Sequence, residues 1–217
     1  MFSLSADFKK NYKNYLESVK HLPIPYLKLK VTVPADAIYQ EWLQVKHLVV
    51  PHRSHDYESH RGWESLCLHG LSATQTEWYT QYGYQRGFPP AHDWTEIADQ
   101  CPQTVAWIKQ TFPSNHYMRI RFMMLRAGGF IAPHTDTAKC ELAPINISIT
   151  QPAGCDFTWT EFGVQPWQPA EAYLMNISFE HAVTNSSDTD RLHMIIDDFS
   201  DFPYTCEQLI KDTVDAM

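Results

Sequence analysis

The sequence predicts an α+β fold, with a double-stranded β-helix core of the jelly-roll or cupin-like type and N-terminal helices that brace one sheet. Three observations lead to this prediction. Apolar residues recur at helical spacing in the first part of the chain. From His116 onwards, short segments of strand character recur between turn signals. The 217 residues suit one domain with a sizeable core, and no repeat or linker divides them.

Composition excludes several classes of protein. A formal net charge of -8 argues against broad nucleic-acid binding, which needs a basic surface. No apolar run is long enough for a membrane span, and the N-terminus lacks the apolar region of a secretory signal. The 5 cysteines are scattered and form no CxxC pair, which favours reduced thiols and a cytoplasmic location. The sequence leaves the oligomeric state open.

The first part of the chain predicts helices separated by loops. Helical spacing or helix-start signals place helices at residues 4–20, 35–48, 95–100 and 102–111. Pro34 suits the first position of the second helix. Alternating Leu27, Leu29 and Val31 predict a strand, and the segment GWESLCLHG predicts another.

Two loops in this part are candidates for covering a site. Residues 51–63 contain three histidines within nine residues, but their spacing matches no zinc site. This segment is either a polar loop or a lid in which Arg53 or Arg61 meets a carboxylate. Residues 74–90 concentrate aromatic side chains among glycine and proline, which predicts a long aromatic loop.

The second part predicts the strands of the core. In HYMRIRFMML, Arg119 and Arg121 share one face and Ile120 and Phe122 the other. Further strands are expected at residues 145–150, 155–160, 170–178 and 191–197, and a closing helix at 206–217.

The segment GGFIAPHTD points to a metal site. In an extended chain, His134 and Asp136 project to the same face and can reach one ion. This spacing alone is weak evidence, because a single H-x-D is expected by chance in a chain of this composition. His181 is a candidate third ligand at the end of a later strand, and Arg191 follows ten residues on. Two imidazoles and one carboxylate that leave open positions are typical of non-haem Fe(II) oxygenases.

Three segments then resemble a known family: RIRFMMLRAGGFIAPHTD, PINISI and YLMNISFEHAVTNSSDTDRLHMIID. They resemble the aspartyl/asparaginyl β-hydroxylase family of 2-oxoglutarate oxygenases, and the bacterial free-proline hydroxylases that share its pattern. The likeness covers about residues 117–198 and is weaker in GWESLCLHG. The mammalian aspartyl branch lacks the carboxylate ligand, whereas Asp136 is present here. The resemblance therefore does not by itself imply an aspartyl substrate.

The resemblance implies Fe(II), 2-oxoglutarate and O2 as cofactor and cosubstrates. It implies that His134, Asp136 and His181 bind the metal and form the catalytic centre. Arg191, with its planar fork, would pair with the distal carboxylate of 2-oxoglutarate. Asn146 stands where the family often has a histidine, and either donates to the other carboxylate or is an ordinary strand residue. His193 either lines the same pocket or is a core histidine.

The resulting prediction is an Fe(II)/2-oxoglutarate-dependent dioxygenase that hydroxylates an amino acid, an amino-acid-like metabolite or a peptidyl residue and releases succinate. The alternatives are a cupin-like metal enzyme that does not use 2-oxoglutarate, and a non-catalytic jelly-roll ligand-binding module. We expect one oxygenase domain over residues 1–217. Its parts are helices and substrate-side loops (1–115), the metal-binding core (116–199) and a C-terminal helix (200–217).

The substrate contacts are the least specified part of the prediction. The candidates are Arg61, Arg121 and Trp78, with Arg53, Arg119 and Tyr82 as further possibilities. An arginine would pair with a substrate carboxylate, and the aromatic rings would cover the substrate side chain. The competing interpretation is that the aromatic side chains pack in the hydrophobic core and that the arginines are exposed to solvent.

Overall fold

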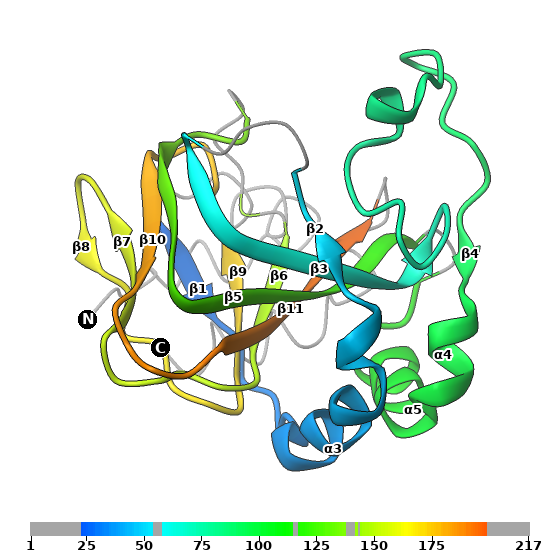
Figure 1. Ribbon diagram of the computed structural model, residues 1–217, viewed down its shortest axis with the longest axis horizontal. Helices are drawn as coiled ribbons and strands as arrows, with labels where there is room; N and C mark the ends of the chain where they lie inside the picture. The colour runs from blue at the N-terminus through cyan, green and yellow to red at the C-terminus, as the bar shows by residue number, and fades with distance from the viewer. Residues whose placement is uncertain (1–22, 54–57, 115–116, 138–141, 143, 199–217) are drawn as a thin grey trace, which may run out of the picture.

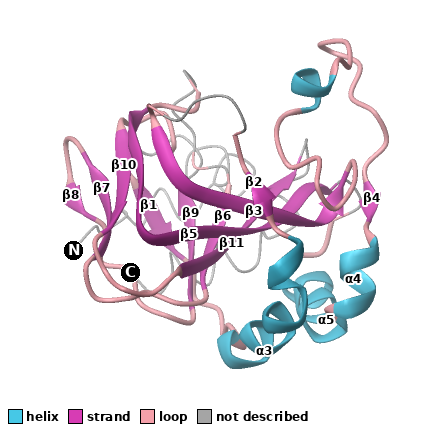
Figure 2. Cartoon of the chain, in the orientation of Figure 1, coloured by secondary structure: helices cyan, strands magenta, loops and turns pink. Residues whose placement is uncertain are grey.

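The computed structural model describes residues 23–53, 58–114, 117–137, 142 and 144–198. A strongly curved sheet runs through the middle of the molecule, and three helices gather on one side of it (Figures 1 and 2). The helices predicted at 4–20 and 206–217 lie outside the described residues. Within the described residues, no helix is both long and apolar enough to span a membrane.

The helices follow the sequence prediction closely. They are α3 (Ala35–Val45), α4 (Glu96–Gln100) and α5 (Pro102–Thr111), with 3-10 turns η1 (Lys46–Leu48) and η2 (Tyr79–Tyr82). Pro34 lies one position before α3 rather than inside it, and Pro102 opens α5. Glu41 of α3 caps α5, because its carboxylate accepts the backbone N–H groups of Gln103 at 2.8 Å and Thr104 at 2.9 Å.

The strands form one continuous antiparallel sheet. They are β1 (Tyr26–Lys28), β2 (Val50–Pro51), β3 (His60–Gly70), β4 (Asp93–Trp94), β5 (Tyr117–His134), β6 (Ile145–Ser148), β7 (Cys155–Trp159), β8 (Gly163–Val164), β9 (Glu171–Met175), β10 (His181–Asn185) and β11 (Arg191–Asp198). The main path is β1-β9-β6-β11-β5-β10-β7-β8, and β3 joins β5, β2 and β4. The jelly-roll prediction is confirmed, although strands from before residue 116 also join the sheet.

Strand β5 is longer than predicted and connects the two halves of the roll. Its first half pairs with β11, its second half pairs with β10, and β3 runs along both (Figure 1). The change of partner occurs at a bend, where Gly128 has a φ of 69°. A Cβ on Gly129 would lie 2.7 Å from the carbonyl oxygen of Arg61 and 2.8 Å from that of Arg126. The two glycines therefore keep β5 continuous where it bends from its pairing with β11 to its pairing with β10.

Asn185, the last residue of β10, holds this bend through its side chain. Its side-chain amide donates to the carbonyl oxygens of Leu125 and Arg126, both at 3.1 Å, and to that of Thr189 at 2.9 Å. Its own oxygen accepts the backbone N–H of Ser187 at 3.2 Å. The segment HAVTNSS thus connects the β10–β11 turn to β5, and Asn185 is buried.

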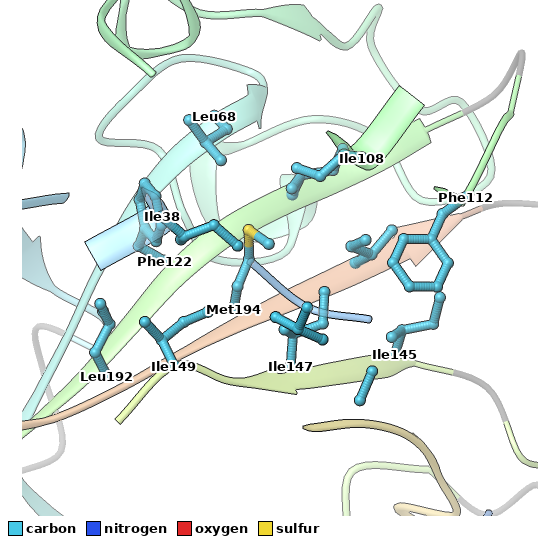
Figure 3. Packing of buried hydrophobic residues seen from close by; sticks show 14 of the residues in the cluster. Ile38, Leu68, Ile108, Phe112, Phe122, Ile145, Ile147, Ile149, Leu192 and Met194 are labelled. Carbon is cyan, nitrogen blue, oxygen red and sulfur yellow. The ribbon is translucent and has the colours of Figure 1, made fainter. Parts of the chain in front are cut away.

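Two apolar clusters fill the two sides of the sheet. The larger lies between the sheet and the helices, and Figure 3 shows Ile38 of α3 and Ile108 of α5 beside Phe122 and Met194 of the sheet. The smaller, aromatic-rich cluster lies on the opposite face of the strands and includes Trp159, Trp167 and Tyr173. The helices therefore brace one sheet face, as predicted, and the polar candidates of the site share the other face.

Candidate active site

His134 and His181 are brought together by strand register. His134 is the last residue of β5, His181 is the first residue of β10, and the two are direct partners in the ladder. The chain after β5 is fixed to the same place, because the backbone N–H of Asp136 donates to the carbonyl of Ile177 at 3.0 Å. His181 was predicted at the end of a strand, and it is in fact at the start of β10.

The three predicted ligands form one group. One ligand atom from each of His134, Asp136 and His181 lies within 4.8 Å of the others. The Asp136 carboxylate is 3.6 Å from His134 Nε2 and 3.5 Å from His181 Nε2. The side-chain exposures are 24% for His134, 33% for Asp136 and 5% for His181, so the group has one open side. This geometry fits a metal ion with positions left for other ligands.

Backbone carbonyls set the tautomer of both histidines. His134 Nδ1 lies 2.8 Å from the carbonyl oxygen of Ala132, and His181 Nδ1 lies 2.9 Å from that of Phe179. Each Nδ1–H must donate there, which leaves the Nε2 lone pairs directed at Asp136. Phe157 stacks on the His181 ring at 5.1 Å between centroids and limits its rotation.

The protonation states also suit a metal. Burial lowers the pKa of His134 and outweighs its hydrogen bond to Ala132. Burial raises the pKa of Asp136, but the neighbouring His181 and His134 and the charge of Arg53 lower it by more, so the net shift is downward. A neutral imidazole and an ionised carboxylate are the forms that coordinate metals.

Arg191 is a buried cation without a described anionic partner. It is 2% exposed, and burial lowers its pKa to about 10. Its Nε donates to Gln151 Oε1 at 3.0 Å, and its guanidinium lies 4.5 Å from the centre of the Trp167 ring. Its Nη2 is buried without a hydrogen-bond partner. An unpaired buried guanidinium is costly, so the site fits a ligand carboxylate such as the distal one of 2-oxoglutarate.

The strands beside Arg191 supply further polar atoms on the same face. His193 is buried, its Nδ1 has no partner, and burial followed by the charges of Arg191 and Arg121 holds its pKa well below the usual range. Ser148 lies opposite His193 in the ladder, and its buried Oγ also lacks a partner. Asn146 is buried on the same strand, opposite Ile195. Sequence reasoning missed Ser148, Gln151 and Trp167, which carry no local signal of their own.

The substrate candidates occupy different settings. Arg61 is exposed, donates to the carbonyl of Gly128 and lies over the Phe130 ring. Trp78 is 38% exposed and lies under the guanidinium of Arg119. Arg121 is 5% exposed and bonded to Asp197. The roles of these residues stay predictions, as do those of Arg53 and Tyr82.

Comparisons with known proteins agree with this site. The family profile described as Aspartyl/Asparaginyl beta-hydroxylase matches residues 35–200. A search of curated protein sequences returned no match. An oxidoreductase of the 2OG-Fe(II) oxygenase family from Burkholderia pseudomallei is similar at 11% identity and a TM-score of 0.51, covering 91% of this chain and 92% of that one.

A second solved structure has the same fold. It is a prolyl hydroxylase from Trichoplax adhaerens in complex with a hypoxia inducible factor peptide fragment, similar at 9% identity and a TM-score of 0.51. The match covers 93% of this chain and 94% of that one. At these identities the two likenesses establish the jelly-roll fold, and the profile match establishes the family. The chain belongs to the aspartyl/asparaginyl β-hydroxylase family and is an iron- and 2-oxoglutarate-dependent hydroxylase.

Proposed function

We propose that this hydroxylase acts on an amino acid, an amino-acid-like metabolite or a peptidyl residue, with His134, Asp136 and His181 holding Fe(II) and Arg191 holding 2-oxoglutarate. The observation that carries the proposal is the group of three ligand atoms within 4.8 Å, two of them oriented by backbone carbonyls. Bound iron and 2-oxoglutarate supply the oxidation, in which O2 is consumed, succinate and CO2 are released, and a substrate C–H becomes C–OH.

The residues around Arg191 would prepare the site for one carboxylate. His193 is kept neutral by burial and by the neighbouring arginines, so it adds no second positive charge there. Gln151 and Trp167 contact the guanidinium, and its Nη2 is buried without a hydrogen-bond partner. Ser148 Oγ and His193 Nδ1 are further polar atoms available to a bound dianion. The cosubstrate would therefore meet a pre-formed set of donors rather than mobile surface charges.

Replacing Asp136 tests the metal assignment. We expect Asp136→Ala to abolish 2-oxoglutarate-coupled succinate formation and to weaken Fe(II) binding by about 10- to 100-fold, because one of three protein ligands is lost. Metal binding is measured by equilibrium dialysis, and activity by succinate release. Asp156→Ala, at an exposed position of β7, is the matched control. Full activity and unchanged iron affinity in Asp136→Ala would show that the metal is held elsewhere.

Zn2+ should compete for the site and inhibit, because it accepts the same ligands without the redox chemistry.

A further inference from the structure

We propose that a chain of aromatic rings carries surplus oxidising equivalents from the metal group of His134, Asp136 and His181 to Tyr173, where they form a tyrosyl radical. This inference rests on the proposed function, because that reaction supplies the oxidant. It gives the fold a second function, which is to protect the protein when O2 and 2-oxoglutarate react without a substrate.

The aromatic chain begins at the metal group. Trp159 lies 5.4 Å from His181 between ring centroids, and Phe157 stacks on the same imidazole at 5.1 Å. Trp159 is buried, and its Nε1–H donates to Gln165 Oε1 at 2.9 Å. The electron-rich rings of tryptophan and tyrosine lose an electron more readily than histidine or phenylalanine. Trp159 is therefore placed to be the first electron donor to an oxidised metal group.

The aromatic chain continues through the smaller apolar cluster to the edge of the sheet. Phe157 contacts both tryptophans, at 4.9 Å from Trp159 and 5.9 Å from Trp167. Trp167 lies 5.1 Å from Tyr173, and Tyr173 lies 5.6 Å from the half-buried Tyr26 of β1. Electrons tunnel readily between rings at such separations, and no side chain has to move. The route thus leads from the metal group towards solvent.

Trp167 is a poor place for a lasting radical. Its Nε1 is buried without a hydrogen-bond partner among the described residues, so an oxidised indole has no acceptor for its proton. The guanidinium of Arg191 lies 4.5 Å from the centre of the ring, and its positive charge opposes a second positive charge there. An electron vacancy on Trp167 is therefore passed to the next ring.

Tyr173 has the proton acceptor that Trp167 lacks. Its hydroxyl donates to the carboxylate of Glu171, which also pairs with Lys28. Burial, and then the bond to Glu171, raise the pKa of Tyr173, so the phenol keeps its proton until it is oxidised. An oxidised phenol is a strong acid, and the Glu171 carboxylate is in position to accept its proton. The pair can lose one electron while the proton stays close by.

The proposed steps balance in electrons and protons. Trp159 gives one electron to the oxidised metal group, and Trp167 then gives one to Trp159. Tyr173 gives one electron to Trp167 while its hydroxyl proton passes to Glu171, which leaves a neutral tyrosyl radical and a carboxylic acid. A soluble thiol then supplies one electron through Tyr26, loses its own proton to water and becomes a thiyl radical. Glu171 returns its proton, and Tyr173 is restored.

Tyr117 provides an internal comparison. It is also buried beside a tryptophan, because its ring lies 5.7 Å from that of Trp94. It belongs to the larger cluster under the helices, and its hydroxyl donates to the carbonyl of Phe112, which is not a base. If contact between aromatic rings alone decided where a radical settles, Tyr117 and Tyr173 would behave alike.

The first experiment detects the radical directly. Protein loaded with Fe(II) and 2-oxoglutarate is mixed with O2 without substrate, frozen and measured by electron paramagnetic resonance, with ring-deuterated tyrosine to identify the signal. We expect a tyrosyl signal that is lost in Tyr173→Phe and in Glu171→Gln and kept in the matched control Tyr117→Phe. Circular dichroism and Fe(II) dialysis check that each variant folds and binds metal. A signal that survives in Tyr173→Phe or Glu171→Gln, or succinate release without any tyrosyl signal, overturns the proposal.

The second experiment measures protection. During incubation with O2 and 2-oxoglutarate but no substrate, Tyr173→Phe should lose its activity sooner than the wild-type protein and Tyr117→Phe. Mass spectrometry of the same samples should find more oxidation at His181 and Trp159, because the oxidising equivalents stay near the metal group. Equal rates of inactivation and equal oxidation in all three proteins would overturn the protective function.

A third experiment needs no iron and separates this inference from the proposed function. Metal-free protein is illuminated with a ruthenium tris-bipyridine photosensitiser and persulfate, and the radical is again observed by electron paramagnetic resonance. Tyr173→Phe should lose most of the tyrosyl signal, and Tyr117→Phe should keep it. If this result is obtained but the iron-loaded protein forms no succinate, the proposed reaction fails while the radical site stands. If the signal is the same in Tyr173→Phe as in the wild-type protein, the radical site is wrong whatever the activity.

Discussion

Arg191 shows how one side chain can specify a ligand. It is 2% exposed, and its described contacts are a neutral amide and an aromatic ring. Neither contact cancels its charge, and a lone buried charge is among the most costly features that a fold can contain. A bound carboxylate offsets this cost. The arrangement therefore lowers the stability of the ligand-free protein and strengthens ligand binding.

Arg191→Lys tests this residue. The lysine keeps the charge, but it lacks the planar guanidinium that can hydrogen-bond Gln151 and a carboxylate at the same time. We expect KM for 2-oxoglutarate to rise by about 10- to 100-fold, which corresponds to the loss of one charged hydrogen bond. Initial rates at varied 2-oxoglutarate measure this change, and dialysis should show nearly unchanged iron binding. An unaltered requirement for 2-oxoglutarate would move the anchor to another arginine.

The proposed metal ligands and Arg191 could be identified from the sequence, and the residues that contact Arg191 and His193 could not. The two-residue spacing of His134 and Asp136 is a local signal, and Arg191 was identified by its position in a resembling segment. Trp167 and Gln151 contact Arg191 from other segments of the chain, and Ser148 meets His193 only through the β6–β11 register. Register and tertiary contact are fixed by the fold as a whole, so no local pattern reveals them.

The bend in β5 is an element whose geometry the site depends on. Gly129→Ala should disrupt it, because the new Cβ would meet two backbone carbonyls that cannot move independently. We expect a loss of about 1–3 kcal/mol in the free energy of unfolding, together with weaker metal binding as His134 shifts. Urea denaturation and dialysis measure the two effects.

Gly87→Ala is the matched control for the bend. Gly87 has a positive φ of 85°, whereas Gly129 does not, and nothing lies within 4 Å of the potential Cβ of Gly87. Gly87→Ala should therefore lower the free energy of unfolding only through backbone strain, by about 1 kcal/mol, and should bind metal normally. Equal effects of the two substitutions would mean that the close approach at Gly129 does not matter.

The predictability of the strands depended on their length and environment. Strands β3, β6, β7, β9 and β11 were predicted, because each alternates or is apolar over four residues or more. Strand β1 was predicted from the alternation of Leu27, Leu29 and Val31. The two-residue strands β2, β4 and β8 were not predicted, since two residues carry no periodicity. Strand β10 was missed although it has five residues. The extension of β5 was missed because Gly128 and Gly129 signal a turn, whereas here they bend a strand that continues.

At the scale of the whole molecule, the lowered pKa values of buried histidines indicate how the free energy of unfolding depends on pH. Burial lowers the pKa of His69 to about 4 and holds those of His52 and His193 well below their usual range. In the unfolded chain each would take up a proton near pH 6.5. The unfolded state therefore binds more protons below that pH, and stability present at neutral pH is lost as the pH falls.

The expected loss can be measured on metal-free protein. His69 alone should lower the free energy of unfolding by about 2 kcal/mol between pH 7.5 and pH 5. Urea titrations at pH 7.5, 6 and 5 in the presence of a chelator give the slope. His69→Phe, which keeps an aromatic ring against Trp94 and Tyr117, should make the slope shallower. The exposed His47→Gln is the control, and an unchanged slope in His69→Phe would contradict the assignment.

The pairing of β5 with β10 also determines when the metal group can exist during synthesis. His134 and Asp136 leave the ribosome long before His181, which follows only after β6 to β9 have been made. Contacts between such distant segments form late, because the intervening chain must first be ordered. A nascent chain therefore contains at first only two of the three proposed ligands and not Arg191. The proposed centre is completed only when β10 and β11 pair with β5.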